Sequence, residues 1–301
     1  MTTAAAEAIT GYIQRLRLER NPSEHTLSAY ACDLKNFHGF LAPLPTEGAT
    51  GDTILAYVAY LVKRRAAART IRRRVACLRG YYRDLATQGG IPVSPFSGLE
   101  MRLPRAKGLP RAIARSDAQL LVRWAWQQCR DHRSVHNIPM AAIAVLVLIS
   151  SGVRVAELTS LQSDDFHADT GALRVLGKGQ RERFVFLADK ELRKLVARLA
   201  GARKGLTLFG HGEGKWTTDW VRRTLRKFAV AAGVSVRVTP HMLRHTCATL
   251  LLEDGVDLRF LQRLLGHESI STTAIYAHVG DAGLQKALES ASLLSRLNRA
   301  A

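Results

Sequence analysis

Six residues in the second half of the chain have types and spacings that suit chemistry at a phosphate group. The guanidiniums of Arg154 and Arg244 could hold phosphate oxygens by forked, charge-assisted hydrogen bonds. His241 lies three residues before Arg244, so the two share one face of a helix. His267 follows Leu264-Leu265-Gly266, where the glycine is typical of a helix end. The set is completed by a lysine between two glycines and by a tyrosine nine residues after His267, at positions Lys178 and Tyr276.

The chemistry that these residue types could perform is nucleophilic attack on a phosphodiester. The charge of a phosphodiester repels nucleophiles, and it concentrates on the non-bridging oxygens during in-line attack. Preorganised donors at those oxygens are commonly worth ~3 kcal/mol or more apiece in the transition state. A tyrosine hydroxyl, whose ordinary pKa is near ~10, needs assistance to attack at neutral pH. The set therefore fits attack by Tyr276 on a phosphorus whose oxygens two arginines hold.

Each residue taken alone also has a simpler interpretation. Arg154 after a Ser-Gly turn could be a surface charge, Lys178 a solvated hairpin tip and Tyr276 a packed aromatic side chain. His241 and His245 have a spacing that zinc ligands can have. The segment HMLRH, however, lacks the glutamate of H-E-x-x-H, and no third ligand has motif spacing, so no metal site is expected.

The elements that must position these residues are of mixed type. The apolar stretch 140–149 predicts a buried core helix, because a span across a bilayer needs ~20 residues. Helices are also predicted from Ser116, over about 137–149 and from Val155. Glu157 is expected to support Arg154 or else to be a helix-surface charge. The β-prone runs 173–176 and 183–187 flank Gly177-Lys178-Gly179-Gln180, which predicts a hairpin.

The first hundred residues predict helices only. Asn21-Pro22-Ser23-Glu24 is expected to start a helix with Asn21 as its cap. In a helix over about 70–87, an apolar stripe lies opposite five arginines, and no acidic residue occurs between Lys63 and Arg83. Such a face is either simply solvated or follows a phosphate backbone, and the missing carboxylates favour the backbone. The stripe is Ile71, Val75, Leu78, Tyr82 and Leu85, and the arginines are Arg69, Arg72, Arg73, Arg79 and Arg83.

A segment rich in proline and glycine, residues 91–110, separates the two parts. It is expected to link a helical domain over residues 1–90 to a second, mixed domain over residues 111–301. Its positive charges, on Arg102, Arg105 and Lys107, would let it lie along a duplex.

Composition narrows the class of protein. A net charge of +19 and a pI of about 10.5, with 47% hydrophobic residues, indicate a folded protein whose partner is a nucleic acid. A generally basic soluble surface is the alternative. The four cysteines lie far apart, which fits a reducing cytoplasm and predicts neither disulfides nor a zinc cluster. The first residues lack the basic and apolar regions of a signal peptide.

The motifs SGVRVAEL, HMLRH and LLGH, in this order and followed by Tyr276, resemble the tyrosine recombinase (phage integrase) family, and its Xer-like members above all. The resemblance covers nearly the whole chain. It implies a mainly α fold with a small β-sheet, in which an all-helical core-binding (SAM-like) domain precedes an α+β catalytic domain. It also implies a site-specific DNA recombinase that forms a 3′-phosphotyrosine and exchanges strands sequentially through a Holliday junction, with no metal, ATP or other cofactor.

The same resemblance implies roles and partners. His241 would assist proton transfer from Tyr276, Lys178 would protonate the leaving 5′ oxygen, and His267 would complete the contacts to the phosphate oxygens. The expected assembly is a homo- or hetero-tetramer on two DNA duplexes in the bacterial cytoplasm, associated with the nucleoid and not with a membrane. A C-terminal helix would pack into a neighbouring subunit through Leu284, Leu288 and Leu294.

Two other functions share part of this pattern. A type IB topoisomerase uses similar catalytic groups to nick and reseal one strand, but it has no need to bring two sites together. A DNA-binding regulator with a silent catalytic domain would bind DNA without cutting it, and the complete set of six residues argues against it. A covalent protein–DNA adduct would distinguish the two enzymes from the regulator, and efficient relaxation of plasmids without a target site would distinguish the topoisomerase from the recombinase.

Overall fold

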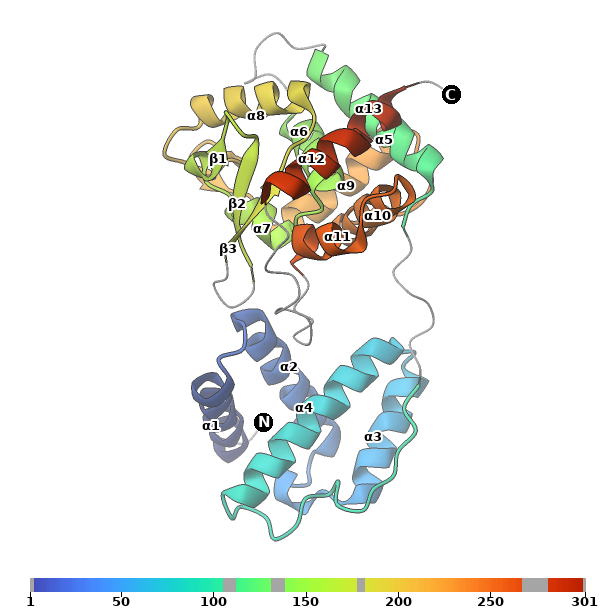
Figure 1. The fold of residues 1–301 in the computed structure, drawn as a ribbon. Helices are drawn as coiled ribbons and strands as arrows, with labels where there is room; N and C mark the ends of the chain where they lie inside the picture. Colours follow the sequence, from blue (N-terminus) through green and yellow to red (C-terminus); the bar gives the residue numbers. More distant parts are fainter. Residues whose placement is uncertain (1–2, 105–111, 131–138, 178–181, 267–280, 300–301) are drawn as a thin grey trace. The chain divides into compact units, whose positions relative to one another are not determined.

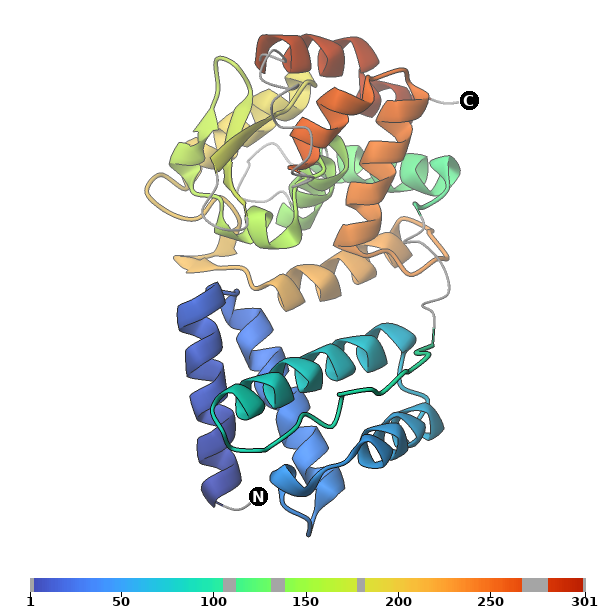
Figure 2. The same ribbon diagram turned by 60° about the horizontal axis from the view of Figure 1, so that its bottom comes forward.

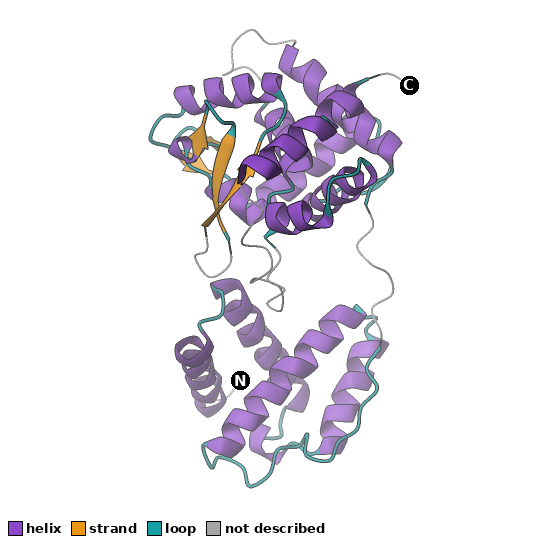
Figure 3. Ribbon diagram, viewed as in Figure 1, coloured by secondary structure: helices purple, strands orange, loops and turns teal. Residues whose placement is uncertain are grey.

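The computed structural model describes residues 3–104, 112–130, 139–177, 182–266 and 281–299. The chain divides into two compact units, a helical unit (Met1–Gly108) and a mixed unit (Leu109–Ala301). Figure 1 shows the helices of both units, and Figure 3 shows that the strands within the described residues all belong to the mixed unit. The predicted fold class, mainly α with a small β-sheet, is confirmed.

The helical unit is held together by aromatic side chains. Phe37, Tyr57, Tyr81 and Tyr82 are among its largest fully buried residues, and their rings meet edge to face at centroid distances of 4.9 to 6.1 Å. Within the unit α1 packs on α2, and both α2 and α3 pack on α4. The elements are α1 (Thr3–Arg20), α2 (Glu24–Leu41), the short 3-10 helix η1 (Thr46–Gly48), α3 (Gly51–Lys63) and α4 (Ala68–Thr87).

The start of α2 differs in one detail from the prediction. The cap is Ser23 and not Asn21, because the Ser23 side chain accepts the hydrogen bond from the Thr26 backbone N–H. Asn21 instead takes a left-handed backbone conformation, with φ of 40°, directly after α1. The turn between α1 and α2 thus uses Asn21 to reverse the chain and Ser23 to start the helix.

The segment after α4 stays with the helical unit as far as the structure describes it (Figure 2). Residues 91–104 contain turns and bends but no helix or strand. Ile91 is buried, and Phe96, Leu99, Met101 and Leu103 pack against the helical core. The carbonyl oxygen of Pro104 accepts a hydrogen bond of 3.0 Å from Arg72 on α4. The described part of this segment is therefore attached to the helices that precede it.

The mixed unit is built around α6 (Met140–Ser151). This helix is apolar on all sides, and residues 142–149 are buried, which fits the predicted core helix. Its neighbours include α5, α8, α9, α10 and α13, so it lies at the centre of the unit (Figure 1). The surrounding helices are α5 (Arg115–Arg130), α7 (Val155–Ser160), α8 (Lys190–Ala202), α9 (Thr218–Ala231), α10 (Pro240–Glu253) and α11 (Leu258–Leu265).

The predicted hairpin strands are present and pair antiparallel. In β2 (Ala172–Leu176) and β3 (Glu182–Phe186), Leu173 lies opposite Val185 and Val175 opposite Arg183. The short β1 (Phe166–His167) pairs with β2 on its other side, after the 3-10 turn η2 (Ser163–Asp165). A separate two-stranded ribbon, β4 (Gly210–His211) and β5 (Gly214–Lys215), precedes α9. Within the described part of the chain, no helix has both the length and the apolar character to cross a membrane.

The last two helices pack onto the unit to which they belong. They are α12 (Asp281–Ala291), which packs on α11 and β3, and α13 (Leu293–Asn298), which packs on α5 and α6. Ion pairs join Glu289 to Arg193 at 2.6 Å and Arg296 to Asp254 at 2.8 Å. The sequence predicted a leucine-bearing helix after Tyr276 that packs into a neighbouring subunit, and in the single chain the leucines of α12 and α13 are buried by their own unit. The buried leucines are Leu284, Leu288, Leu293, Leu294 and Leu297.

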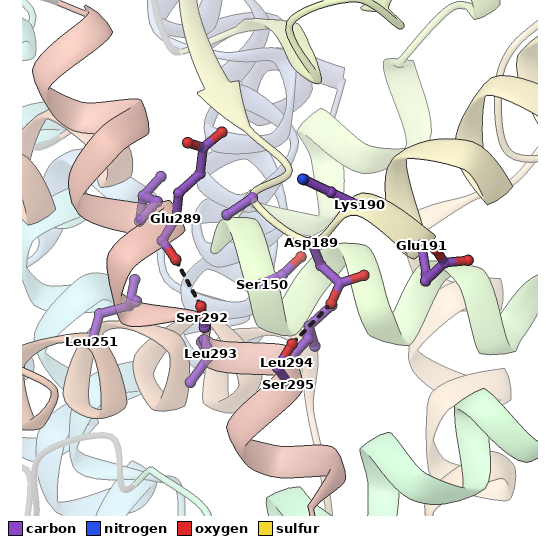
Figure 4. A pocket seen from close by; sticks show the side chains of 12 residues that line it. Ser150, Asp189, Lys190, Glu191, Leu251, Glu289, Ser292, Leu293, Leu294 and Ser295 are labelled. Carbon is purple, nitrogen blue, oxygen red and sulfur yellow. Dashed lines mark hydrogen bonds between the residues drawn. The ribbon is translucent and has the colours of Figure 1, made fainter.

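A cavity of about 390 Å³ lies between these last helices and the body of the mixed unit. Figure 4 shows Glu289 of α12, Ser295 of α13 and Ser292 between these two helices, near Asp189 and Lys190 at the start of α8. The hydroxyl of Ser295 lies 3.4 Å from the Asp189 carboxylate and joins the two sides. Of the predicted catalytic residues that the structure describes, none lines this cavity. The cavity is therefore part of the interface between the C-terminal helices and the rest of the mixed unit.

Candidate active site

Arg154 is positioned by the turn between α6 and α7. Helix α6 ends at Gly152, which has a left-handed φ of 63°. A Cβ at this position would lie 2.9 Å from a Leu265 methyl group and 3.3 Å from the Cys247 sulfur, so packing as well as conformation calls for glycine. Arg154 then caps the start of α7, and its backbone N–H donates to the Glu157 carboxylate at 2.7 Å. The motif Ser-Gly-Val-Arg thereby fixes where the Arg154 side chain begins.

The Glu157 carboxylate is the centre of a hydrogen-bonded cluster. Its Oε1 accepts from Nη1 of Arg154 and from Nη1 of Arg183, each at 2.8 Å. Its Oε2 accepts from Nη2 of Arg183 at 2.9 Å and from the Arg154 backbone. Burial of the carboxylate, whose side chain is 4% exposed, raises its pKa, but the hydrogen bonds and charges of Arg183 and Arg154 prevail and hold the pKa at about 2. Glu157 is therefore ionised at neutral pH.

Arg244 enters the same region from α10. This helix begins with Thr239 as its cap and Pro240 in its first turn. The Arg244 side chain is buried and donates to the Gly152 carbonyl oxygen at 2.6 Å and to the Leu265 carbonyl oxygen. Burial, followed by the charge of Arg154, lowers the pKa of Arg244 to about 10, so it remains a cation at neutral pH.

The C-terminus of α11 gathers three arginines. The carbonyl oxygens of Leu264, Leu265 and Gly266 accept hydrogen bonds from Arg183, Arg244 and Arg154 respectively. The last carbonyl groups of a helix have no partner within the helix and carry a partial negative charge, so they are natural acceptors for cations. Gly266 ends the helix with a left-handed φ of 60°, as its place in LLGH predicted.

Arg183 on β3 is a member of this cluster that the motifs did not single out. Its Nε donates to the Leu264 carbonyl oxygen at 3.1 Å, while both of its terminal nitrogens donate to Glu157. A Cβ on Gly266 would lie 3.1 Å from its Nε and Cδ, which is a second reason for glycine there. The only signal in the sequence was an arginine close behind the predicted hairpin turn, on a β-prone run.

The structure thus brings some of the predicted residues together. Arg154, Arg244 and Glu157 lie in one cluster, and His241 lies one helical turn before Arg244, exposed at the start of α10. Lys178, His267 and Tyr276 lie outside the described residues. Gly266, whose carbonyl oxygen Arg154 contacts, is nevertheless the residue directly before His267. Within the described ranges, no group of three or more His, Cys, Asp or Glu side chains could hold a metal ion.

The predicted basic face of α4 lies on the surface of the helical unit. Its apolar stripe is buried, whereas Arg69, Arg72, Arg79 and Arg83 are exposed. The fifth arginine, Arg73, makes an ion pair with Asp33 of α2, which is 2% exposed, and Arg74 approaches the same carboxylate at 3.4 Å. Arg73 is therefore partly committed to the structure of its own unit. Arg102 is exposed, and Arg105 and Lys107 lie outside the described residues.

Comparisons with known proteins show the family of the chain. Residues 127–282 match the Phage integrase family, and residues 9–89 match the N-terminal SAM-like domain of phage integrases. Tyrosine recombinase XerC of Thermodesulfovibrio yellowstonii is 34% identical over 284 residues, which cover 90% of this chain and 91% of that protein. Tyrosine recombinase XerD of Pseudomonas aeruginosa is 33% identical over 298 residues, which cover 95% of this chain and 97% of that protein.

Solved structures share the fold. A lambda integrase dimer bound to a COC′ core site superposes with a TM-score of 0.69 at 20% identity, over 90% of this chain and 76% of that one. The XerH site-specific recombinase bound to a palindromic difH substrate gives a TM-score of 0.66 at 19% identity, over 89% of this chain and 80% of that one. With both of its parts matched and its relatives covered almost end to end, the chain belongs to the phage integrase family of tyrosine recombinases.

Proposed function

We propose that this enzyme cuts and rejoins DNA at a specific site through a 3′-phosphotyrosine on Tyr276, exchanging strands one pair at a time through a Holliday junction. The observation that carries the proposal is the meeting of Arg154 and Arg244 on the carbonyl oxygens of Gly266 and Leu265, directly before His267. Two guanidiniums in one cluster supply the positive charge that a phosphodiester needs during in-line attack.

The two arginines would contribute in different ways. Arg154 has a side chain that is 42% exposed, so its guanidinium is open to a phosphate while Glu157 and Gly266 hold it in place. Arg244 is 7% exposed, and two of its terminal N–H groups donate to carbonyl oxygens, so its geometry is set before DNA arrives. In the proposed reaction both donate to non-bridging oxygens of the scissile phosphate.

The remaining members of the set complete the proposed reaction. The Tyr276 hydroxyl attacks the phosphorus, His241 assists removal of its proton, and His267 donates to a phosphate oxygen. Lys178 gives a proton to the leaving 5′ oxygen. The tyrosyl ester retains the energy of the broken bond, so a free 5′ hydroxyl can reverse the step on the same strand or on a partner strand. The reaction as written needs no cofactor.

DNA would be held by both parts of the chain in the bacterial cytoplasm. We assign DNA binding to residues 1–90, with the exposed arginines of α4 near the phosphate backbone, a linking role to residues 91–110 and catalysis to residues 111–301. The charge of +19 supports a partner with many phosphates. Strand exchange needs two duplexes, and we propose a tetramer, of this chain alone or with a second recombinase, as the unit that holds them.

Exchange of the C-terminal helices between subunits is part of this proposal. In the single chain, the leucines of α12 and α13 are buried against the mixed unit of the same chain. On exchange, the two helices would make the same contacts with the mixed unit of a neighbouring subunit. The Arg296–Asp254 ion pair joins α13 to the residue that follows α10, and it offers a way to detect which chain receives the helix.

The test of the proposed function is capture of the covalent intermediate. Footprinting on genomic DNA first supplies a bound sequence, and a duplex of that sequence with a nick beside the cleavage point then traps the intermediate, because the short 5′ hydroxyl fragment diffuses away. The wild-type chain should give a protein–DNA adduct that survives SDS, and Tyr276→Phe should give none. No adduct from either chain would favour a binding regulator, and efficient relaxation of plasmids without the site would favour a topoisomerase.

A further inference from the structure

We infer that Arg183 is a positioning residue for DNA cleavage: it holds Glu157, and through Glu157 it fixes the direction and the net charge of Arg154. The inference rests on the proposed function, because it concerns the same cleavage step. It assigns to Arg183 no contact with the DNA and no proton transfer.

The contacts of Arg183 all lead back into the protein. Both of its terminal nitrogens donate to Glu157, at 2.8 and 2.9 Å, in a forked arrangement. Its Nε donates to the Leu264 carbonyl oxygen at 3.1 Å. Each nitrogen therefore has an acceptor within the protein, and the side chain is 14% exposed, compared with 42% for Arg154. A phosphate that approached the cluster would meet Arg154 rather than Arg183.

The cluster connects three separate parts of the mixed unit. Arg183 comes from β3, five residues after Lys178 in the sequence, and Glu157 comes from α7. The third partner is the end of α11, directly before His267. One planar guanidinium thus links β3, the start of α7 and the end of α11. Replacing it should therefore disturb the position of Arg154 more than it disturbs the affinity for DNA.

Arg183 also sets the charge that remains for substrate. Arg154 and Glu157 alone would form a neutral pair, whose attraction for a phosphate is weak. Because Glu157 Oε1 is shared between Arg154 and Arg183, the group of three carries a net charge of +1, and Arg244 adds another. Loss of Arg183 would therefore both loosen Glu157 and let it neutralise Arg154.

A double-mutant cycle tests whether Arg183 acts through Glu157. The variants are Arg183→Met, Glu157→Gln and the two together, with Arg183→Lys as a milder change that keeps the charge and loses the fork. The measured quantities are the single-turnover rate of adduct formation on the nicked duplex and, separately, the Kd for an intact duplex. Arg174→Met is the matched control, since Arg174 lies on the neighbouring strand and pairs with Asp165 at 2.9 Å.

We expect Arg183→Met to slow adduct formation about 100-fold while the Kd changes less than about threefold. In the Glu157→Gln background the same substitution should cost less than about threefold, because its route of action is already lost. Arg183→Lys should recover part of the rate, and Arg174→Met should leave it within about twofold. If the effects of the two substitutions simply multiply, or if the loss lies in the Kd, the inference is wrong although the proposed function stands. Absence of an adduct with the wild-type chain would overturn the proposed function, and this inference with it.

Discussion

Replacement of Glu157 by glutamine tests the charge balance of the arginine cluster with little change of shape. The carboxylate is almost fully buried and accepts hydrogen bonds from two guanidiniums and one backbone N–H. Glutamine keeps the length of the side chain, but it loses the negative charge and places an amide N–H₂ group beside the arginines. We expect the variant to be less stable near neutral pH, and the difference from wild type to shrink as the pH falls.

The size of the effect follows from the pKa of Glu157. An ordinary glutamate has a pKa near ~4.3 in the unfolded chain, and in the folded chain the pKa is about 2. Because folding lowers this pKa, the carboxylate stabilises the fold above pH ~4.3, and that stabilisation is lost as the pH falls towards 2. The contribution is about 3 kcal/mol at pH 6 and about half of that at pH 3. The wild-type-minus-variant free energy of unfolding should therefore fall by about 1.5 kcal/mol between these two values, whatever constant offset the altered hydrogen bonds add.

The tryptophans make this measurement possible in the full chain. All four, Trp124, Trp126, Trp216 and Trp220, lie in the mixed unit, so their fluorescence during urea unfolding reports on that unit. Glu191→Gln is the control, because Glu191 is 70% exposed and pairs only with the exposed Lys194 among the residues that the structure describes. Its difference from wild type should stay within about 0.5 kcal/mol at every pH. A Glu157→Gln difference that is constant from pH 6 to 3, or that grows towards pH 3, would refute the reasoning.

Two further predictions concern DNA binding and assembly. Replacing both Arg69 and Arg83 by glutamine, on the exposed face of α4, should lower the slope of log Kd against log salt by about 2, measured by fluorescence anisotropy. Arg73→Gln should instead chiefly lower the stability of the helical unit, because it removes a partner of buried Asp33. An unchanged slope in the double variant would place that face away from DNA. For helix α13, Arg296→Asp and Asp254→Arg should each lower recombination, because each breaks the ion pair between these residues. A mixture of the two variant chains should recover activity only if α13 crosses between subunits. If the mixture stays inactive while a chain with both substitutions is active, α13 stays on its own subunit.

Local features of the fold were predictable because they depend on neighbours in the sequence. The stripe Ile71 to Leu85 is buried as its spacing predicted, and Gly266 ends α11 in the left-handed conformation that glycine favours. The strands β2 and β3 pair as the β-prone composition of these two runs indicated. The grouping of Arg154 with Arg244 could not be predicted from neighbouring residues in the sequence. Ninety residues separate them, and only the likeness of the motifs to a family joined them before their contacts with Gly266 and Leu265 were seen.

Contacts between distant residues account for what the sequence did not reveal. The basic run of α4 contains no carboxylate, yet Asp33 reaches Arg73 from α2, forty residues away. Arg183 looked like any polar residue on a strand, because its role exists only once β3, α7 and α11 have come together. The leucines of the last helices indicated that a partner must cover them, but periodicity cannot say which chain supplies it. In the single chain, α13 packs its leucines against α5 and α6 of the same chain.

The choice of acceptors in the cluster explains how three arginines can be held without losing their charge. A carboxylate for each guanidinium would satisfy the N–H groups, but it would leave a neutral site with little attraction for a phosphodiester. Here one carboxylate, Glu157, serves two arginines, and the carbonyl oxygens at the end of α11 satisfy further N–H groups through dipoles that carry no net charge. Three cations and one anion leave a net charge of +2 in a partly buried place. The phosphate of the substrate is the group that would neutralise it, and for that reason the cluster should bind the transition state, with its added negative charge, more tightly than the ground state.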